Sequence, residues 1–230
     1  MAYFMPRFVH LHTHSHYSLL DGLPKIPELV TRVKALGMDA IALTDHGNLY
    51  GAVEFYKAAL EAGIKPIFGI EAYVAPGDHR DKNADGPDKY FHLTLIVENE
   101  TGWKNLLQLV TASHLDGFYY RPRMSKELLR AHHAGLIALS GCYSGETTKA
   151  ILGGRAGEAE RIVREYQDIF GKENFFIEIG HHPNFDRANF DRVRKALIEL
   201  SNATGAPSVA TQDIHYLCRE DAEYHDVLLA

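Results

Sequence analysis

The chain has 230 residues, of which 46% are hydrophobic and 23% charged, as is typical of a soluble globular protein with one large domain or two small ones. It has neither the roughly 18 consecutive apolar residues of a transmembrane helix nor a secretory signal at its start, so we expect a cytoplasmic protein with no membrane partner. The net charge of −6 excludes a general electrostatic attraction to nucleic acid.

Short β-rich runs alternate with amphipathic helical patterns along the chain. The predicted strands are 7–11, 40–43, 65–74, 90–97, 135–140, 175–179 and 207–210. The predicted helices are 26–36, 50–62, 103–113, 125–132, 158–170, 185–201 and 219–230. This alternation predicts about seven parallel βαβ units, and one closed or nearly closed α/β barrel suits the length better than two domains.

The last predicted helix, 219–230, has no stop signal, so we expect residues 1–230 to form a single domain cut from a longer chain. The composition is unusual in its 14 histidines, several of which lie near Asp, Glu or Cys. Histidine is the commonest metal ligand in proteins. We interpret the two cysteines as core, ligand or nucleophile rather than as a disulfide.

The first motif with chemical potential follows the first predicted strand. His12 and His14 are two residues apart, so a strand-like backbone points both imidazoles to one side. Asp21 follows after a turn and could add a carboxylate oxygen to the same centre. The alternative is a histidine-rich loop that binds no metal.

Two further candidates follow the next strands. His46 comes directly after an apolar strand, with Asp45 as a supporting carboxylate, although Asp-His-Gly is also a plain turn sequence. Glu71 shares one face of its strand with Ile67 and Gly69. A carboxylate buried there needs a partner, which could be a metal or equally an Arg or Lys side chain.

The remaining candidates are one histidine, one cysteine and a final pair. His92 opens an apolar strand and Cys142 follows another; the alternatives are an ordinary core histidine and an inert buried thiol. As a ligand the thiolate would favour zinc or similar ions over magnesium. Asp213 and His215 lie two apart beyond the last strand, as His12 and His14 do at the first. Six strand ends thus present nine metal-type side chains, which points to one rim of the barrel.

Several stretches carry a family resemblance: HLHTHSHYSLLDG at 10–22, TDHGNLYGAVEFYKAALEAGIKPIFGIEAYVAPG at 44–77, YFHLTLIVEN at 90–99, GLIALSGC at 135–142 and ATQDIHY at 210–216. They resemble the polymerase and histidinol phosphatase family, and its bacterial replicative polymerase subgroup rather than its stand-alone phosphatases. The resemblance implies a distorted seven-stranded (β/α) barrel with a trinuclear metal site. The ligands it implies are His12, His14, Asp21, His46, Glu71, His92, Cys142, Asp213 and His215.

Some polymerases of this family have lost ligands and activity, whereas this sequence departs at none of the nine positions. The resemblance therefore implies a metal-dependent 3′–5′ exonuclease that proofreads DNA. Two or three divalent cations are expected, with zinc preferred over manganese or iron. Such ions lower the pKa of a water molecule and neutralise phosphate charge. Asp21, Glu71 or Asp213 could bridge the ions or orient that water.

Substrate contacts are predicted at Arg121, Arg123 and His182, the first two beside tyrosines in a loop suited to phosphate and base binding. An ordinary exposed basic turn is the alternative. Two competing hypotheses are a histidinol-phosphatase-like phosphomonoesterase and a structural metal module without hydrolysis. The expected partners are the 3′ end of a DNA primer, the remaining domains of the polymerase subunit that hold the DNA, and other replisome components.

Overall fold

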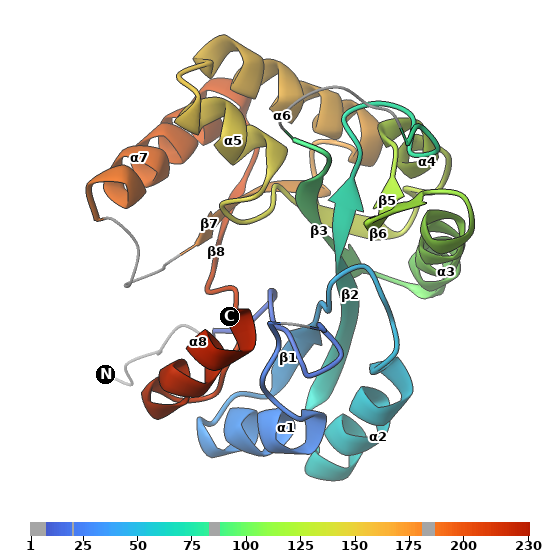
Figure 1. The fold of residues 1–230 in the computed structure, drawn as a ribbon, viewed down its shortest axis with the longest axis vertical. Coiled ribbons are helices and arrows are strands. Elements are labelled where there is room, and N and C mark those ends of the chain that lie inside the picture. Colours follow the sequence, from blue (N-terminus) through green and yellow to red (C-terminus); the bar gives the residue numbers. More distant parts are fainter. Residues whose placement is uncertain (1–7, 20, 83–87, 181–186) are drawn as a thin grey trace, which may run out of the picture.

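The computed structural model describes residues 8–19, 21–82, 88–180 and 187–230, and Figure 1 shows its helices and strands. The helices are α1 (Ile26–Ala35), α2 (Ala52–Ala62), α3 (Glu100–Leu115), α4 (Lys126–Ala131), α5 (Glu146–Leu152), α6 (Ala156–Phe170), α7 (Arg187–Thr204), the 3-10 turn η1 (Arg219–Asp221) and α8 (Ala222–Leu229). The strands are β1 (Ala40–Leu43), β2 (Lys65–Val74), β3 (Phe91–Val97), β4 (Phe118–Tyr119), β5 (Arg121–Met124), β6 (Leu136–Leu139), β7 (Phe175–Gly180) and β8 (Ser208–Thr211).

The strands form one curled, mixed sheet in the order β4-β5-β2-β3-β6-β7-β8, with β1 paired to β2. Helices α1 to α7 lie around the outside of this sheet (Figure 1), which confirms the α/β barrel-like fold class. The prediction of parallel strands throughout is wrong at β3, which is antiparallel to both β2 and β6. The described part of segment 75–90 contains no helix, and strands joined without a crossover helix pair antiparallel.

The reversal of β3 decides where its first residues lie. His92, near the start of β3, pairs with Tyr73, near the end of β2. His92 therefore lies at the same rim as the carboxyl ends of the parallel strands, where a barrel carries its site.

The prediction of a strand at 7–11 is wrong for the described residues 8–11, although the segment lies in the place of a strand. The amide of Ala42 donates to the carbonyl of His10 at 2.8 Å, and Thr44 donates to Thr13 at 2.9 Å. On the other side, the amide of His14 donates to the carbonyl of Ile214 at 2.8 Å. The segment thus divides its hydrogen bonds between β1 and the chain after β8. It forms no continuous ladder with either. The curled sheet is a half-barrel that is open between β1 and β8, and the segment lies across this open side.

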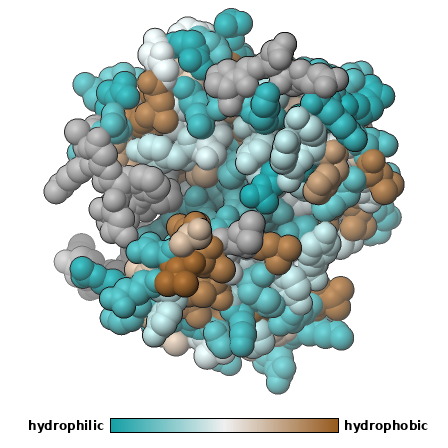
Figure 2. Space-filling model, in the orientation of Figure 1, coloured by the Kyte–Doolittle hydropathy of each residue, from teal (hydrophilic) through white to brown (hydrophobic). Residues whose placement is uncertain are grey.

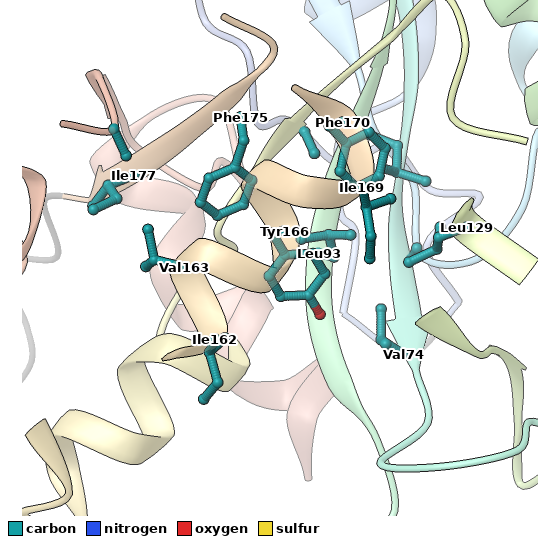
Figure 3. Close-up of a cluster of buried hydrophobic side chains, with 14 of the residues drawn as sticks. Val74, Leu93, Leu129, Ile162, Val163, Tyr166, Ile169, Phe170, Phe175 and Ile177 are labelled. Atoms are coloured by element: carbon teal, nitrogen blue, oxygen red, sulfur yellow. The ribbon is translucent and has the colours of Figure 1, made fainter. Parts of the chain in front are cut away.

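Two buried apolar clusters hold these strands. The larger lies between the sheet and helices α3 to α7, and Figure 3 shows Tyr166 and Phe170 of α6 beside Phe175 of β7. The rings of Tyr166 and Phe175 stack with centroids 5.4 Å apart. The smaller cluster packs α1 and α2 against β1. Each fully buried aliphatic side chain contributes about 1.5–3 kcal/mol of burial free energy. The packing of these side chains therefore holds β1, β2 and β3, and the rim that they form, in place.

No helix in the described ranges has both the length and the apolar character needed to cross a bilayer. The face in Figure 2 is mainly hydrophilic, with separate apolar patches. One of them lies over α8, where the side chains of Val227, Leu228 and Leu229 are exposed.

Candidate metal centre

Ligand-type side chains from six separate segments meet at one rim of the sheet. The N-terminal segment supplies three, β2 and β3 supply one each, and the turns after β1, β6 and β8 supply the rest. All nine predicted ligands lie here, and each contacts at least one other: His12, His14, Asp21, His46, Glu71, His92, Cys142, Asp213 and His215.

Glu71 lies at the centre of this group and is only 1% exposed. Each of its carboxylate oxygens faces different neighbours. Oε1 lies 2.9 Å from His92 Nδ1, 3.2 Å from His12 Nε2 and 3.3 Å from Cys142 Sγ. Oε2 lies 2.8 Å from His46 Nδ1 and 3.6 Å from His14 Nε2. The two oxygens of Glu71 thus face separate groups of nitrogen and sulfur atoms, each of which could hold a cation together with one of these oxygens.

The two aspartates flank this centre at different depths. Asp213 Oδ1 lies 3.3 Å from His14 Nε2 and 3.4 Å from His215 Nδ1. Its backbone φ of 50° is in the left-handed region, which is uncommon for a residue other than glycine and often accompanies functional positions. Asp21 Oδ2 lies 2.9 Å from His46 Nε2, and its side chain is 27% exposed, compared with 10% for Asp213.

The centre also contains buried polar atoms that make no well-aligned hydrogen bond, although several lie within 4 Å of an opposite charge. They are His12 Nε2, His14 Nε2, Asp21 Oδ1, His46 Nδ1, Glu71 Oε2 and Asp213 Oδ1. Leaving such an atom unsatisfied costs about 1–3 kcal/mol. Three sets of ligand atoms each lie within 4.8 Å of one another: those of His14, His46 and His215; of His12, His14 and Glu71; and of His46, Glu71 and His92. Imidazole, carboxylate and thiol donors so arranged fit divalent ions of the zinc type.

Asp45 supports the centre without facing it. Its carboxylate accepts hydrogen bonds from the amide of Ser15 at 2.7 Å and from the hydroxyl of Ser18 at 2.8 Å. Ser18 Oγ in turn lies 2.8 Å from His14 Nδ1. Since the single hydroxyl proton of Ser18 goes to Asp45, the oxygen accepts from His14 Nδ1–H. The lone pair of His14 Nε2 then points into the centre.

Mutual charges set the pKa values of these groups. Burial alone would lower the pKa of His46, but the charge of Glu71 and the hydrogen bond to Asp21 raise it to about 10. Burial, together with the charge of His46, lowers the pKa of His14 to about 3. Burial opposes ionisation of Glu71, yet the charges of His92, His12 and His46 hold its pKa well below the usual range. Burial and then the Glu71 charge raise the pKa of the Cys142 thiol. Protonated histidines thus balance the buried carboxylates when no cation is present.

The predicted substrate residues are placed differently from one another. The guanidinium of Arg121 lies 5.7 Å from the ring centroid of Tyr73, and that ring is 5.7 Å from the ring of His46. Arg123 is fully buried and donates to the carbonyls of Gly117, His79 and Asp81. The prediction that Arg123 contacts substrate therefore does not fit its place, since β5 directs it into packed backbone. His182 lies outside the described residues.

Two residues near the centre were not predicted. Glu178 of β7 lies 2.6 Å from His12 Nδ1, and its signal in the sequence was a carboxylate within an apolar strand, as for Glu71. The ring of His225 in α8 lies 5.6 Å from that of His215. No local pattern identified His225, because it reaches the centre only through the packing of α8.

Comparison with known proteins finds similar sequences and similar folds. Residues 10–182 match the family model of the PHP domain. The chain is 45% identical over 223 residues to the DNA polymerase III subunit alpha of Treponema pallidum, covering 96% of this chain and 19% of that protein. It is 46% identical over 230 residues to the subunit of the same name from Thermus aquaticus, covering 97% of this chain and 18% of that one. The chain therefore spans about a fifth of the length of these relatives.

Solved structures share the fold at low sequence identity. An amidohydrolase from Chromobacterium violaceum superposes with a TM-score of 0.58 at 15% identity, covering 96% of both chains. A two-domain protein from Bacteroides vulgatus that contains a predicted PHP-like metal-dependent phosphoesterase gives a TM-score of 0.55 at 17% identity. That match covers 95% of this chain and 55% of the Bacteroides chain.

Proposed function

This chain belongs to the PHP domain family, and from that premise we propose that it is the N-terminal domain of a bacterial DNA polymerase III alpha subunit and hydrolyses DNA phosphodiesters from the 3′ end. Its role would be to remove mismatched nucleotides in the cytoplasm. The remaining polymerase domains and other replisome components would hold most of the DNA, consistent with the acidic charge of −6.

The observation that carries this proposal is the group of nine ligand-type side chains around Glu71, several of whose buried atoms make no well-aligned hydrogen bond. We propose that the nine residues hold two or three divalent cations and that zinc is preferred over manganese or iron. When bound, such ions supply an activated water at neutral pH and neutralise the charge of the phosphate. Asp21, Glu71 and Asp213 are the carboxylates placed to bridge ions or to orient that water.

The exposure of the ligands indicates the side from which substrate approaches. His12, His14 and Glu71 are buried, whereas Asp21 is 27% exposed and His215 is 18% exposed. Arg121 lies on this more open side, because its charge interacts with Asp21 and its guanidinium covers Tyr73. We assign Arg121 the contact with a phosphate oxygen next to the scissile bond, since a guanidinium matches phosphate geometry.

The direct test measures nucleotide release from a primer with a mismatched 3′ end. Asp21→Asn and Asp213→Asn should each lower the rate on the order of 100-fold or more, because each removes a carboxylate that would hold a cation or orient the attacking water. Asp168→Asn, an exposed position on α6, is the matched control and should leave the rate unchanged. Unchanged release in both centre variants would refute the site.

A structural metal module is the second candidate, favoured by the complete burial of His12 and His14. It predicts zinc-dependent melting without hydrolysis of any substrate. Turnover of a simple phosphomonoester without primer hydrolysis would instead indicate a phosphatase. Zinc content, primer assay and phosphomonoester assay on one preparation separate the three functions.

A further inference from the structure

A buried carboxylate outside the nine ligand candidates lies directly behind one of them. Glu178 of β7 is 2% exposed, and its Oε1 lies 2.6 Å from Nδ1 of His12. None of the nine ligand candidates lies on β7. Glu178 is therefore the contribution of this strand to the centre.

The proton positions on His12 follow from its two neighbours. A carboxylate can only accept a hydrogen bond, so the short contact with Glu178 places the proton of a neutral imidazole on Nδ1. The other ring nitrogen, Nε2, is buried without a hydrogen bond and lies 3.2 Å from Glu71 and 3.5 Å from Asp213. When the ring is neutral, as a ligand must be, the Nε2 lone pair therefore faces the centre.

Glu178 is itself fixed from several strands. The Thr211 hydroxyl of β8 donates to Oε1 at 2.7 Å, and the Thr94 hydroxyl of β3 donates to Oε2 at 3.2 Å. The backbone amide of Glu178 donates to the Ser140 hydroxyl at 2.9 Å. Both carboxylate oxygens therefore have fixed donors, and the orientation of His12 is determined before any ion arrives.

The same design recurs at the neighbouring histidine. His14 Nδ1 donates a hydrogen bond to the hydroxyl oxygen of Ser18, and that hydroxyl donates a hydrogen bond to Asp45. Two buried histidines thus point Nε2 inward, each held by an acceptor behind it. Such partners fix the tautomer and orientation of a metal-binding imidazole.

We propose that Glu178 is a positioning residue that holds His12 with its Nδ1 proton outward and its Nε2 lone pair on the cation. This inference rests on the metal centre of the proposed function. It adds a tenth residue to the nine ligand candidates. Glu178 would touch no ion itself but would set the orientation of His12, which would bind one.

The test compares Glu178→Met, which removes the acceptor at similar volume, with Glu178→Gln, whose amide oxygen can still accept from Nδ1. Glu165→Met, on the outer helix α6, is the control for loss of a carboxylate. Zinc affinity is measured by competition with a chromophoric chelator. Glu178→Met should bind zinc about 10- to 100-fold more weakly, Glu178→Gln should recover part of the loss, and the control should match the unaltered protein.

A second readout does not depend on activity or overall stability. Long-range proton–nitrogen NMR spectra report which ring nitrogen of His12 carries the proton, and we expect Nδ1 in the unaltered zinc-loaded protein and loss of that signal in Glu178→Met. Unaltered zinc affinity in Glu178→Met, or a Gln variant as weak as the Met variant, would overturn the role of Glu178 alone. Failure of the unaltered protein to bind zinc would instead overturn the metal centre as a whole.

Discussion

Two arginines of one strand show how strongly position decides the role of a residue. Arg121 and Arg123 are two residues apart on β5, and the sequence predicted the same substrate contact for both. Arg121 covers Tyr73 next to the centre, whereas Arg123 is enclosed by three backbone carbonyls. The proposed function gives Arg121 a contact with phosphate, whereas Arg123 ties the hairpin of β4 and β5 to segment 79–81.

Substitution of these two arginines should therefore have opposite effects. Arg121→Gln should lower kcat/KM on a DNA primer about 10- to 100-fold, since a hydrogen bond to a charged group is worth about 1.5–3 kcal/mol, with little change in unfolding. Arg123→Gln should lower the free energy of unfolding by about 2–4 kcal/mol, because buried carbonyls lose their donors. Primer kinetics and urea denaturation of both variants check this. Equal kinetic losses with unchanged stability would contradict the assignment.

The charges of the centre predict that zinc binding releases protons. The pKa of His46 is raised to about 10 against the effect of burial, by Glu71 and Asp21, and the pKa of Cys142 is raised by its burial and by Glu71. Both groups carry a proton at pH 7 in the metal-free protein and must lose it to bind an ion. Apparent zinc affinity should therefore rise between pH 6 and 8. Calorimetry in buffers of different ionisation enthalpy measures the release, and a heat independent of buffer would contradict it.

Single residues were predictable where a strand end carried an unusual side chain. The nine ligand candidates all stand out in this way, and the structure brings all nine together. Glu178 was missed because its neighbours in space, Thr94 and Thr211, lie far from it in sequence. Arg123 was misassigned because local sequence does not show which side of a short hairpin faces packed backbone.

At the scale of elements, apolar periodicity located β1 and β2 with their observed bounds, and most other elements within about three residues. Strands β4 and β5 were not predicted, because β4 has only two residues and β5 has only four, which is too short to show an alternation of apolar and polar side chains. The local sequence pattern also did not predict the antiparallel direction of β3. This direction follows from the absence of a crossover helix, and that reversal carries His92 to the rim.

The close packing of α3 against the chain before β6 can be tested at one glycine. A Cβ on Gly102, in the first turn of α3, would lie 1.8 Å from the carbonyl oxygen of Gly135 before β6. Gly102→Ala should therefore destabilise the fold by about 1–3 kcal/mol, as overpacking does. Gly157→Ala in α6, where nothing lies within 4 Å, should stabilise it by about 0.5–1 kcal/mol. Urea denaturation compares the two, and equal shifts would show that α3 does not pack closely against the strand.

At the scale of the whole molecule, the ligand candidates join the two ends of the chain. The N-terminal segment contacts Ile214 and β1 by backbone hydrogen bonds and the turn after β1 by hydrogen bonds to Asp45, while His12 and His14 face Asp213 across the same gap. Side chains of the centre thus add to the backbone hydrogen bonds that join the N-terminal segment to the chain after β8. Bound cations would cross-link segments about 200 residues apart in sequence.

Removal of metal should therefore loosen this closure before it unfolds the rest. With free zinc at about 100 times its Kd, binding adds about 2.7 kcal/mol to the stability of the folded state, and chelation should remove that amount as a fall in Tm. Hydrogen exchange should accelerate first in residues 8–19 and in α8, since the apolar clusters under α3 to α7 do not depend on the centre. The Asp213→Asn variant is the control, because its Tm should respond weakly to zinc or chelator. A Tm independent of metal, or exchange that accelerates uniformly, would show that the barrel closes without the ions.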